Sequence, residues 1–186
     1  MAERAETVND DDVAIARDAV LRTFRWVNGH TSFAPVFLDA DTLRALGQGL
    51  VKPFREKGIT AVVAPEARGF IVGSLCAVTL GVGFLAARKP GFPRPEDQVK
   101  VVSEPDWRGR RVEFSIARVL TATDRVLLVD DWIETGSQAT AIAEAIRQTG
   151  ATLAGTTVIV DQASSHVRAV LNVVGLLRRD ELPASD

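Results

Sequence analysis

The chain has little of what would place it outside the cell, in a membrane or on a nucleic acid. Cys76 is the only cysteine among 186 residues, which excludes an intramolecular disulfide and a cysteine metal cluster. The 22 basic residues nearly balance the 24 acidic ones, and a net charge of -2 predicts neither a nucleic-acid nor a membrane partner. No hydrophobic run approaches a membrane span, and the acidic first dozen residues lack the apolar core of a secretion signal. We therefore expect a soluble, cytoplasmic protein.

Other common sites are missing as well. His30 and His166 are isolated and have no neighbouring ligand set, which argues against a zinc site built by the protein. The glycines at positions 81 and 83 fit a dinucleotide pattern only on paper, because they precede a strand instead of following one. Cys76 lies in an apolar stretch typical of a buried helix, where a lone cysteine is usually a small hydrophobic residue.

The length and composition predict one compact domain. Hydrophobic residues make up 46% of the chain, enough for a sizeable core. We expect a disordered tail over residues 1–12 and a single domain over 13–186. Its N-terminal part, 13–57, would hold helices over 13–27 and 41–57, with a loop over 28–35 between them.

Short apolar runs alternate with helical segments over 58–163, the predicted core. The pattern favours an α/β fold, with a mainly parallel twisted sheet flanked by helices. Residues 164–186 form a C-terminal extension, and the proline- and glycine-rich segment 89–111 is typical of a mobile active-site loop. The expected strands are 60–64, 82–87, 126–129 and 155–160, and the expected core helices are 69–80 and 137–149.

The stretch VLLVDDWIETGSQAT, residues 126–140, carries the clearest chemical signal. A buried strand ends in two carboxylates, Asp130 and Asp131, and ligands of parallel sheets bind at the carboxyl ends of strands. The turn and first helical turn expose unpaired backbone N–H groups, and the helix dipole adds positive charge there. We therefore predict a phosphate cradle formed by Thr135, Gly136, Ser137, Gln138 and Ala139.

Two carboxylates beside a phosphate cradle suit a ligand that also carries hydroxyl groups. A ribose 5-phosphate fits, with its phosphate in the loop and its 2- and 3-hydroxyls on Asp130 and Asp131. The same negative charge would favour a cationic ribose as a glycosidic bond breaks. The alternative is an ordinary strand, turn and helix with solvated aspartates, which a bare Asp-Asp pair would favour but the whole string does not.

This string resembles the phosphoribosyl-pyrophosphate signature of the type I phosphoribosyltransferases. Residues 62–73 (VVAPEARGFIVG) and 80–93 (LGVGFLAARKPGFP) resemble adenine phosphoribosyltransferases. The resemblance implies the family fold with a small N-terminal hood and a flexible loop, phosphoribosyl pyrophosphate and a purine base as substrates, Mg²⁺ as cofactor near Asp130 and Asp131, and a homodimer. It also implies a pyrophosphate site formed by Glu66, Ala67, Arg68, Gly69, Arg88 and Lys89.

The resemblance also suggests two candidates for the general base. In the 6-oxopurine branch of the family, an acidic residue at the position of Glu134 faces the purine and accepts its proton. Asp106, which with Trp107 resembles an acidic-aromatic pair of the family's flexible loop, is the second candidate. Glu134 could equally serve only to favour the N-terminus of the following helix. Ser137 and Gln138 also depart from the adenine-type phosphate loop.

The acceptor base is the least determined part of the function. Glu134 favours a 6-oxopurine, but Lys100 is the last lysine, so the lysine by which that branch reads an exocyclic oxygen is missing. Transfer of 5-phosphoribose to adenine, giving AMP and pyrophosphate in purine salvage, is our leading interpretation. Alternatives are a non-catalytic regulator that binds the donor and an enzyme for another base. Val36 and Phe37 could contact the base, or could be core residues that anchor their loop.

Overall fold

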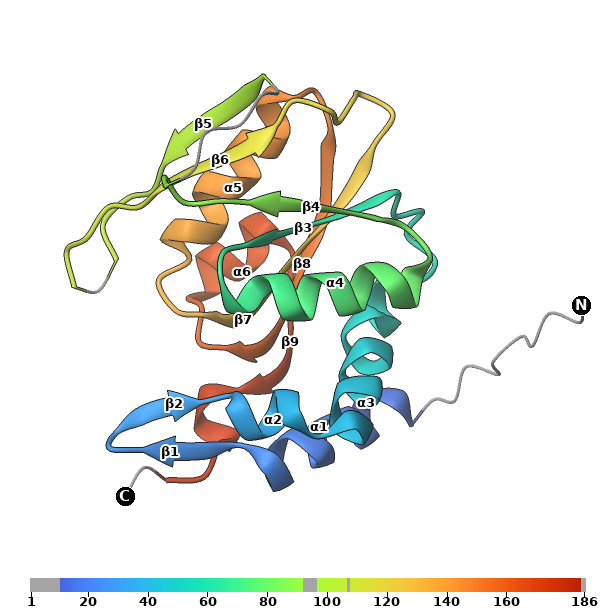
Figure 1. Ribbon diagram of the computed structural model, residues 1–186, viewed down its shortest axis with the longest axis vertical. Coiled ribbons are helices and arrows are strands. Elements are labelled where there is room, and N and C mark those ends of the chain that lie inside the picture. Colours follow the sequence, from blue (N-terminus) through green and yellow to red (C-terminus); the bar gives the residue numbers. More distant parts are fainter. Residues whose placement is uncertain (1–10, 92–96, 107, 185–186) are drawn as a thin grey trace, which may run out of the picture.

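The computed structural model describes residues 11–91, 97–106 and 108–184. One five-stranded sheet with the order β4-β3-β7-β8-β9 forms its centre, and every neighbouring pair is parallel (Figure 1). This confirms the mainly parallel sheet flanked by helices. The strands are β3 (Ala61–Pro65), β4 (Gly83–Ala87), β7 (Arg125–Ile133), β8 (Thr152–Asp161) and β9 (Val173–Arg178), and the helices that connect them are α4 (Arg68–Leu80), α5 (Ser137–Gln148) and α6 (Ser165–Leu171).

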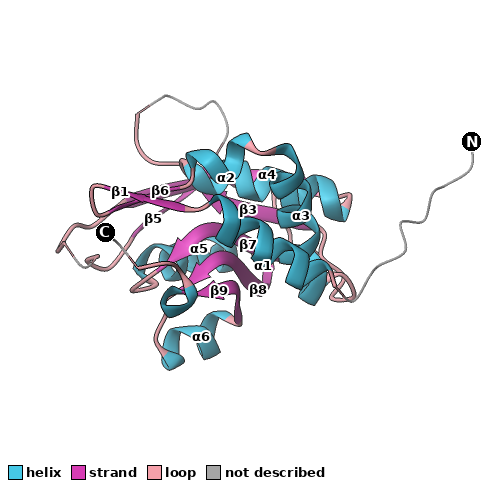
Figure 2. Cartoon of the chain, turned by 90° about the horizontal axis from the view of Figure 1, so that it is seen from below, coloured by secondary structure: helices cyan, strands magenta, loops and turns pink. Residues whose placement is uncertain are grey.

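Alternating side chains of the sheet enter two separate cores. On β7, Leu127 and Val129 pack with α4 and the N-terminal helices, while Val126 and Leu128 pack with α5. Successive strand residues point to opposite faces, so a continuous apolar run is what a sheet covered on both sides requires. Figure 2 shows the strands between these helical layers.

The N-terminal region differs from the prediction in its connection. The helix expected over 13–27 is α1 (Asp12–Thr23), and the expected loop is a hairpin of β1 (Arg25–Val27) and β2 (His30–Ser32) followed by α2 (Ala34–Leu38). Asn28 and Gly29 have φ of 51° and 72°, as a two-residue hairpin turn of the Asn-Gly type needs. The second helix is α3 (Ala40–Val51), which continues as the 3-10 turn η1 (Lys52–Phe54) over Pro53.

The segment 89–111 is not wholly a loop. It contains β5 (Gln98–Val102), which pairs antiparallel with β6 (Glu113–Ala117) and packs with α5 over one face of the sheet. Val99 and Val101 are buried whereas Lys100 and Val102 are exposed, the alternation of a half-buried strand. The connection that remains between these strands, described over residues 103–106 and 108–112, reaches the cavity described below, and residues 92–96 lie outside the described residues.

The sheet extends further than expected at two places. β7 continues to Ile133, so Asp130 and Asp131 lie inside the strand and not after it. The expected C-terminal extension supplies β9, the edge strand beside β8, and then the 3-10 turn η2 (Arg179–Glu181). Among the described residues, no helix is long and apolar enough to cross a membrane.

Candidate active site

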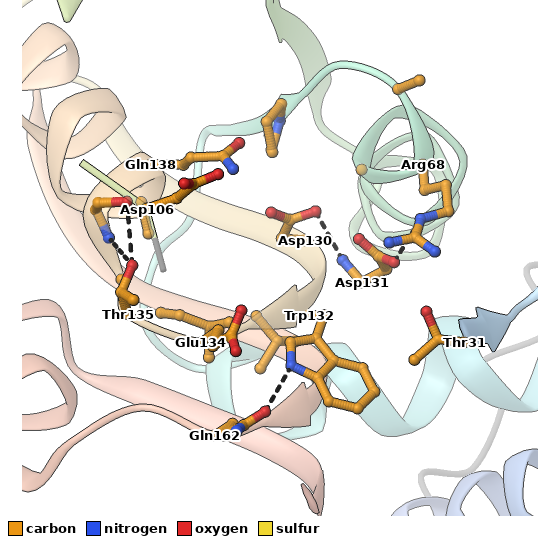
Figure 3. Close-up of a pocket in the computed structure, with 18 of the residues that line it drawn as sticks. Thr31, Arg68, Asp106, Asp130, Asp131, Trp132, Glu134, Thr135, Gln138 and Gln162 are labelled. Carbon is orange, nitrogen blue, oxygen red and sulfur yellow. Dashed lines mark hydrogen bonds and ion pairs between the residues drawn. The ribbon is translucent and has the colours of Figure 1, made fainter. Parts of the chain in front are cut away.

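A cavity of about 700 Å³ opens at the carboxyl ends of β3, β7 and β8 (Figure 3). Loops at this edge of a parallel sheet are where ligands bind. The cavity brings together most of the residues that the sequence singled out. Those that line it are Glu66, Ala67, Arg68, Gly69, Lys89, Asp106, Asp130, Asp131, Glu134, Thr135, Gly136, Ser137, Gln138 and Ala139.

Asp130 and Asp131 lie side by side in the cavity. The Oδ1 atom of Asp130 accepts a hydrogen bond from the Asp131 backbone N–H at 2.8 Å, and Asp131 Oδ2 lies 2.8 Å from Arg68 Nε. Burial raises the pKa of the Asp130 carboxyl well above its ordinary value, and the adjacent Asp131 carboxylate raises it further. The arginine therefore neutralises Asp131, while Asp130 presents its acceptor oxygens to the cavity.

The predicted phosphate cradle has the geometry of an anion site. Gly136, with φ of 79°, turns the chain from β7 into the twelve-residue helix α5. The hydroxyl of Thr135 contacts the Ser137 hydroxyl at 3.1 Å and accepts from the Ser137 backbone N–H at 3.3 Å. The N–H groups of Gln138 and Ala139 belong to the first turn, where the helix itself supplies no acceptors. Backbone donors and the positive end of the helix dipole thus face the same space.

The loop after β3 forms the opposite wall. Its Glu66–Ala67 peptide bond is cis, and Gly69 packs closely against the strand. A Cβ on Gly69 would lie 2.9 Å from Pro65 Cδ and 3.1 Å from Asp130 Oδ1, so a side chain here would displace the carboxylate. The Arg68 guanidinium lies between Asp131 and the ring of Phe33, 5.3 Å from the ring centroid.

The two cations at the end of β4 differ in position. Lys89 lines the cavity, and its backbone N–H donates to Glu66 Oε2 at 3.1 Å. Arg88 is not among the residues that line the cavity. Its Nε lies 3.9 Å from Glu66 Oε2, and its backbone pairs with Ser115 of β6. Lys89 is therefore the better placed of the two for a bound anion.

Asp106 lines the cavity, but the loop itself uses its carboxylate. Oδ1 accepts from the backbone N–H groups of Arg108 at 2.8 Å and Arg110 at 2.9 Å, and Oδ2 faces the Arg110 guanidinium. The pKa of Asp106 is lowered by the Arg110 backbone bond first, and the Arg108 backbone and Arg110 side chain lower it further. Such a carboxylate is a weak proton acceptor, which favours Glu134 as the general base. Trp107 lies outside the described residues.

Neither Val36 nor Phe37 reaches the cavity. Val36 is completely buried in the core, which leaves no surface for a base and contradicts that candidate role. Phe37 stacks on Phe33 with 5.7 Å between ring centroids, and it too is absent from the cavity wall. Both residues anchor the hood, the alternative that their sequence allowed.

The wall beyond Glu134 is instead formed by residues without a predicted role. They come from the hairpin, from the ends of β7 and β8, and from η2: Trp26, His30, Thr31, Trp132, Gln162 and Arg179. Trp132 is part of the quoted motif, and Gln162 lies two residues beyond the strand expected over 155–160, so both positions carried a signal. Arg179 and Trp26 are brought together only by the fold.

Two remaining predictions concern metal sites and Cys76. In the part of the chain that the structure describes, no three His, Cys, Asp or Glu side chains are grouped to hold a metal ion. Cys76 is buried in α4, and burial raises the pKa of its thiol to about 12. A thiol of this kind stays protonated and belongs to the core.

The chain is similar to known proteins in sequence. It is 36% identical over 138 residues to the adenine phosphoribosyltransferase of Methylococcus capsulatus, covering 74% of this chain and 80% of the relative. The enzyme of the same name from Serratia proteamaculans is 37% identical over 127 residues, covering 68% of this chain but only 63% of the relative, which is less than two thirds. No protein-family model matches the chain.

Solved structures agree with these relatives. Adenine phosphoribosyltransferase from Rhodothermus marinus superposes with a TM-score of 0.76 at 26% identity, covering 89% of this chain and 99% of that one. The Saccharomyces cerevisiae enzyme, solved with an imino-altritol bisphosphate and adenine, has a TM-score of 0.75 at 28% identity, covering 88% and 99%. The cavity, the sheet and the relatives agree, and the chain belongs to the adenine phosphoribosyltransferase family.

Proposed function

We propose that the protein transfers 5-phosphoribose from phosphoribosyl pyrophosphate to adenine, giving AMP and pyrophosphate. The observation that carries the proposal is the single cavity that joins Asp130 and Asp131 to the phosphate cradle at one end and to Arg68 and Lys89 at the other. The donor carries a 5-phosphate, then a ribose with two free hydroxyls, then a pyrophosphate. It therefore needs an anion site, a site that accepts from hydroxyls and a second anion site, in that order. The names of the relatives support adenine as the acceptor.

The donor would lie across the carboxyl ends of β3 and β7. Its 5-phosphate would accept from the backbone N–H groups at the start of α5 and from the hydroxyls of Thr135 and Ser137. The ribose hydroxyls would donate to Asp130 and Asp131. The pyrophosphate would accept from the loop after β3 and from Lys89, and it would draw the Arg68 guanidinium away from Asp131, because a pyrophosphate carries more negative charge than one carboxylate.

The reaction exchanges one bond at C1 of the ribose. The bond from C1 to the pyrophosphate oxygen breaks and its electron pair leaves with pyrophosphate, while a ring nitrogen of the base forms the new bond to C1. The base loses the proton that it carried on nitrogen, and Glu134, which lines the cavity, would accept it. The carboxylates of Asp130 and Asp131 favour the positive charge that develops on the ribose.

Magnesium belongs to the same proposal. Mg²⁺ prefers oxygen ligands and keeps several waters, and the Asp130 carboxylate offers such an oxygen to the cavity. Asp131 is already paired with Arg68, so most ligands would come from the donor's own oxygens. When bound, the ion would neutralise charge on the leaving pyrophosphate.

Two further expectations from the sequence also remain proposals. A homodimer would cover apolar side chains that this chain exposes on α4, where Val78 is 81% and Ile71 45% exposed. A cytoplasmic location would give the protein access to its donor, because phosphoribosyl pyrophosphate is a highly charged metabolite that does not cross membranes unaided.

The test is an assay of pyrophosphate release with magnesium, the donor and a panel of purine and pyrimidine bases. Release that depends on adenine supports the proposal. Donor binding in a calorimeter without turnover on any base would replace it with a non-catalytic regulator, the reading that Ser137 and Gln138 favour. Turnover on another base alone would keep the transferase and change its acceptor.

Gly136→Ala should weaken binding of ribose 5-phosphate about tenfold and lower the free energy of unfolding by about 2 kcal/mol. A Cβ at this position would lie 2.5 Å from Cγ1 of Val167 in α6, so the loop must move away from the geometry that aims its N–H groups. Calorimetric titration and thermal unfolding measure the two effects.

Gly81→Ala is the matched control for this change. Gly81 has a similar φ of 71°, but no atom lies within 4 Å of its added Cβ. The control should share the backbone cost and leave ligand binding unchanged. Equal binding losses in both variants would contradict a role for the Gly136 contact.

A further inference from the structure

Three side chains meet at the end of the cavity beyond the ribose site. Trp132 pairs with Val160 in the β7–β8 register and Ile133 pairs with Asp161, so Glu134 and Gln162 come next to one another where the two strands end. The Gln162 backbone N–H donates to the Ile133 carbonyl at 2.9 Å and extends this pairing. Figure 3 shows Trp132, Glu134 and Gln162 gathered at this end.

The indole of Trp132 sets the orientation of the Gln162 side-chain amide. Trp132 Nε1 donates to Gln162 Oε1 at 3.2 Å. An indole N–H can only donate, so the amide oxygen must face it and the NH₂ group is left to face other partners. Turned over, the amide would place its own N–H against the indole N–H. The NH₂ group is therefore the part of the Gln162 side chain that is left to meet a ligand in the cavity, which Gln162 lines together with Glu134. An ionised Glu134 can only accept hydrogen bonds.

Trp132 is itself held in place. Its ring meets that of Trp26 edge to face, with 6.4 Å between centroids. Trp26 in turn lies under the Arg179 guanidinium, 4.6 Å from the ring centroid, and its Nε1 donates to the Pro183 carbonyl at 2.8 Å. The indole that orients Gln162 therefore rests on a second indole fixed from two sides.

We infer that Gln162 and Glu134 read the acceptor base, with Trp132 as the positioning residue that fixes the order of donor and acceptor. The inference rests on the proposed function. Adenine presents an N–H donor at its 6-amino group beside a lone pair at the neighbouring ring nitrogen, whereas hypoxanthine presents the reverse, an oxygen beside an N–H. Glu134 would accept from the 6-amino group with one carboxylate oxygen and face the imidazole edge, whose proton it takes up, with the other, while Gln162 would donate to the six-membered-ring nitrogen on the other side of the amino group. This order of acceptor and donor matches adenine and opposes hypoxanthine.

The inference is tested by equilibrium binding, which does not depend on turnover. Adenine and hypoxanthine are titrated calorimetrically into the full chain in the presence of ribose 5-phosphate. Gln162→Leu should raise the Kd of adenine about tenfold or more, because the base loses its hydrogen-bond donor on the cavity wall. Trp132→Phe, which keeps a ring but frees the amide to turn, should reduce the preference for adenine over hypoxanthine about tenfold. Gln148→Leu is the matched control, since Gln148 is an exposed glutamine bonded to Glu144 outside this cavity.

The outcomes separate the inference from the proposed function. In all three variants the Kd of ribose 5-phosphate should stay within about twofold of the wild-type value, as no residue of the phosphate cradle is changed. Three results would each overturn the inference. They are unchanged adenine binding in Gln162→Leu, a loss of ribose 5-phosphate binding in that variant as large as its loss of adenine binding, and tighter binding of hypoxanthine than of adenine by the wild-type protein. Failure of the wild type to release pyrophosphate would instead count against the proposed function, whatever the binding ratios.

Discussion

Replacing both Asp130 and Asp131 by asparagine should reduce affinity for phosphoribosyl pyrophosphate about a thousandfold. Each ribose hydroxyl would lose a charge-assisted bond, and two such bonds account for a loss of this size. Arg68 would also lose the carboxylate that holds its Nε at 2.8 Å. Calorimetric titration with the donor and magnesium measures the change, and unaltered affinity would mean that the carboxylates do not contact the ribose.

The single variant Asp130→Asn separates a loss of binding from a loss of folding, because we expect it to raise stability at neutral pH. The folded-state pKa of Asp130 lies above its ordinary value, so this carboxyl adds stability when protonated, and that contribution disappears as pH rises through the folded-state pKa. At neutral pH the ionised group is unfavourable in the fold. The variant should therefore melt at a higher temperature than the wild type at about pH 8, and the difference should vanish toward about pH 4. A variant that melts lower at both values would contradict the raised pKa.

Glu134→Gln should lower kcat for transfer to adenine by about a hundredfold to ten-thousandfold, the usual contribution of a general base. The amide keeps the size and polarity of the side chain but cannot take up the proton that the base loses. KM for the donor should stay nearly constant, since Glu134 lies beyond the ribose site. Steady-state rates of pyrophosphate release at saturating donor measure both constants.

Glu104→Gln is the control for this substitution. Glu104 is 78% exposed, forms an ion pair with Arg111 and does not line the main cavity. Its replacement should leave kcat unchanged. If Glu134→Gln also retained full activity and only lowered the melting temperature, Glu134 would serve the N-terminus of α5 and another group would accept the proton.

The donor half of the site could be predicted from the sequence because its parts are local. Asp130, Asp131 and the cradle at Thr135–Ala139 lie within ten residues, and the continuous apolar run before them requires a strand covered on both faces. The start of the helix that follows then directs the backbone N–H groups of its first turn toward the same space. No distant contact had to be known, and the structure brings all of these residues into one cavity.

The acceptor half could not be predicted in the same way. Its wall depends on the contact of Trp26 with Arg179 and on the pairing of Gln162 with Trp132, and no local pattern specifies either. The Asn28-Gly29 pair is typical of a hairpin turn, but the helical spacing of the apolar residues before it favoured a helix up to residue 27, so the hairpin was not predicted. Val36 and Phe37 resembled base contacts because an apolar residue near a site and one beneath it look alike in sequence.

The two contacts that hold Trp26, the Arg179 guanidinium over its ring and the hydrogen bond to the Pro183 carbonyl, have a consequence for synthesis on the ribosome. The bond from Trp26 Nε1 to the Pro183 carbonyl joins residues 157 positions apart, whereas the phosphate cradle adjoins its own strand and helix. A nascent chain can form the cradle once β8 has emerged from the exit tunnel, but the wall around Trp132 stays open until residues 179–183 follow. An arrested chain ending after β8 would therefore carry an anion site before it carries a selective one.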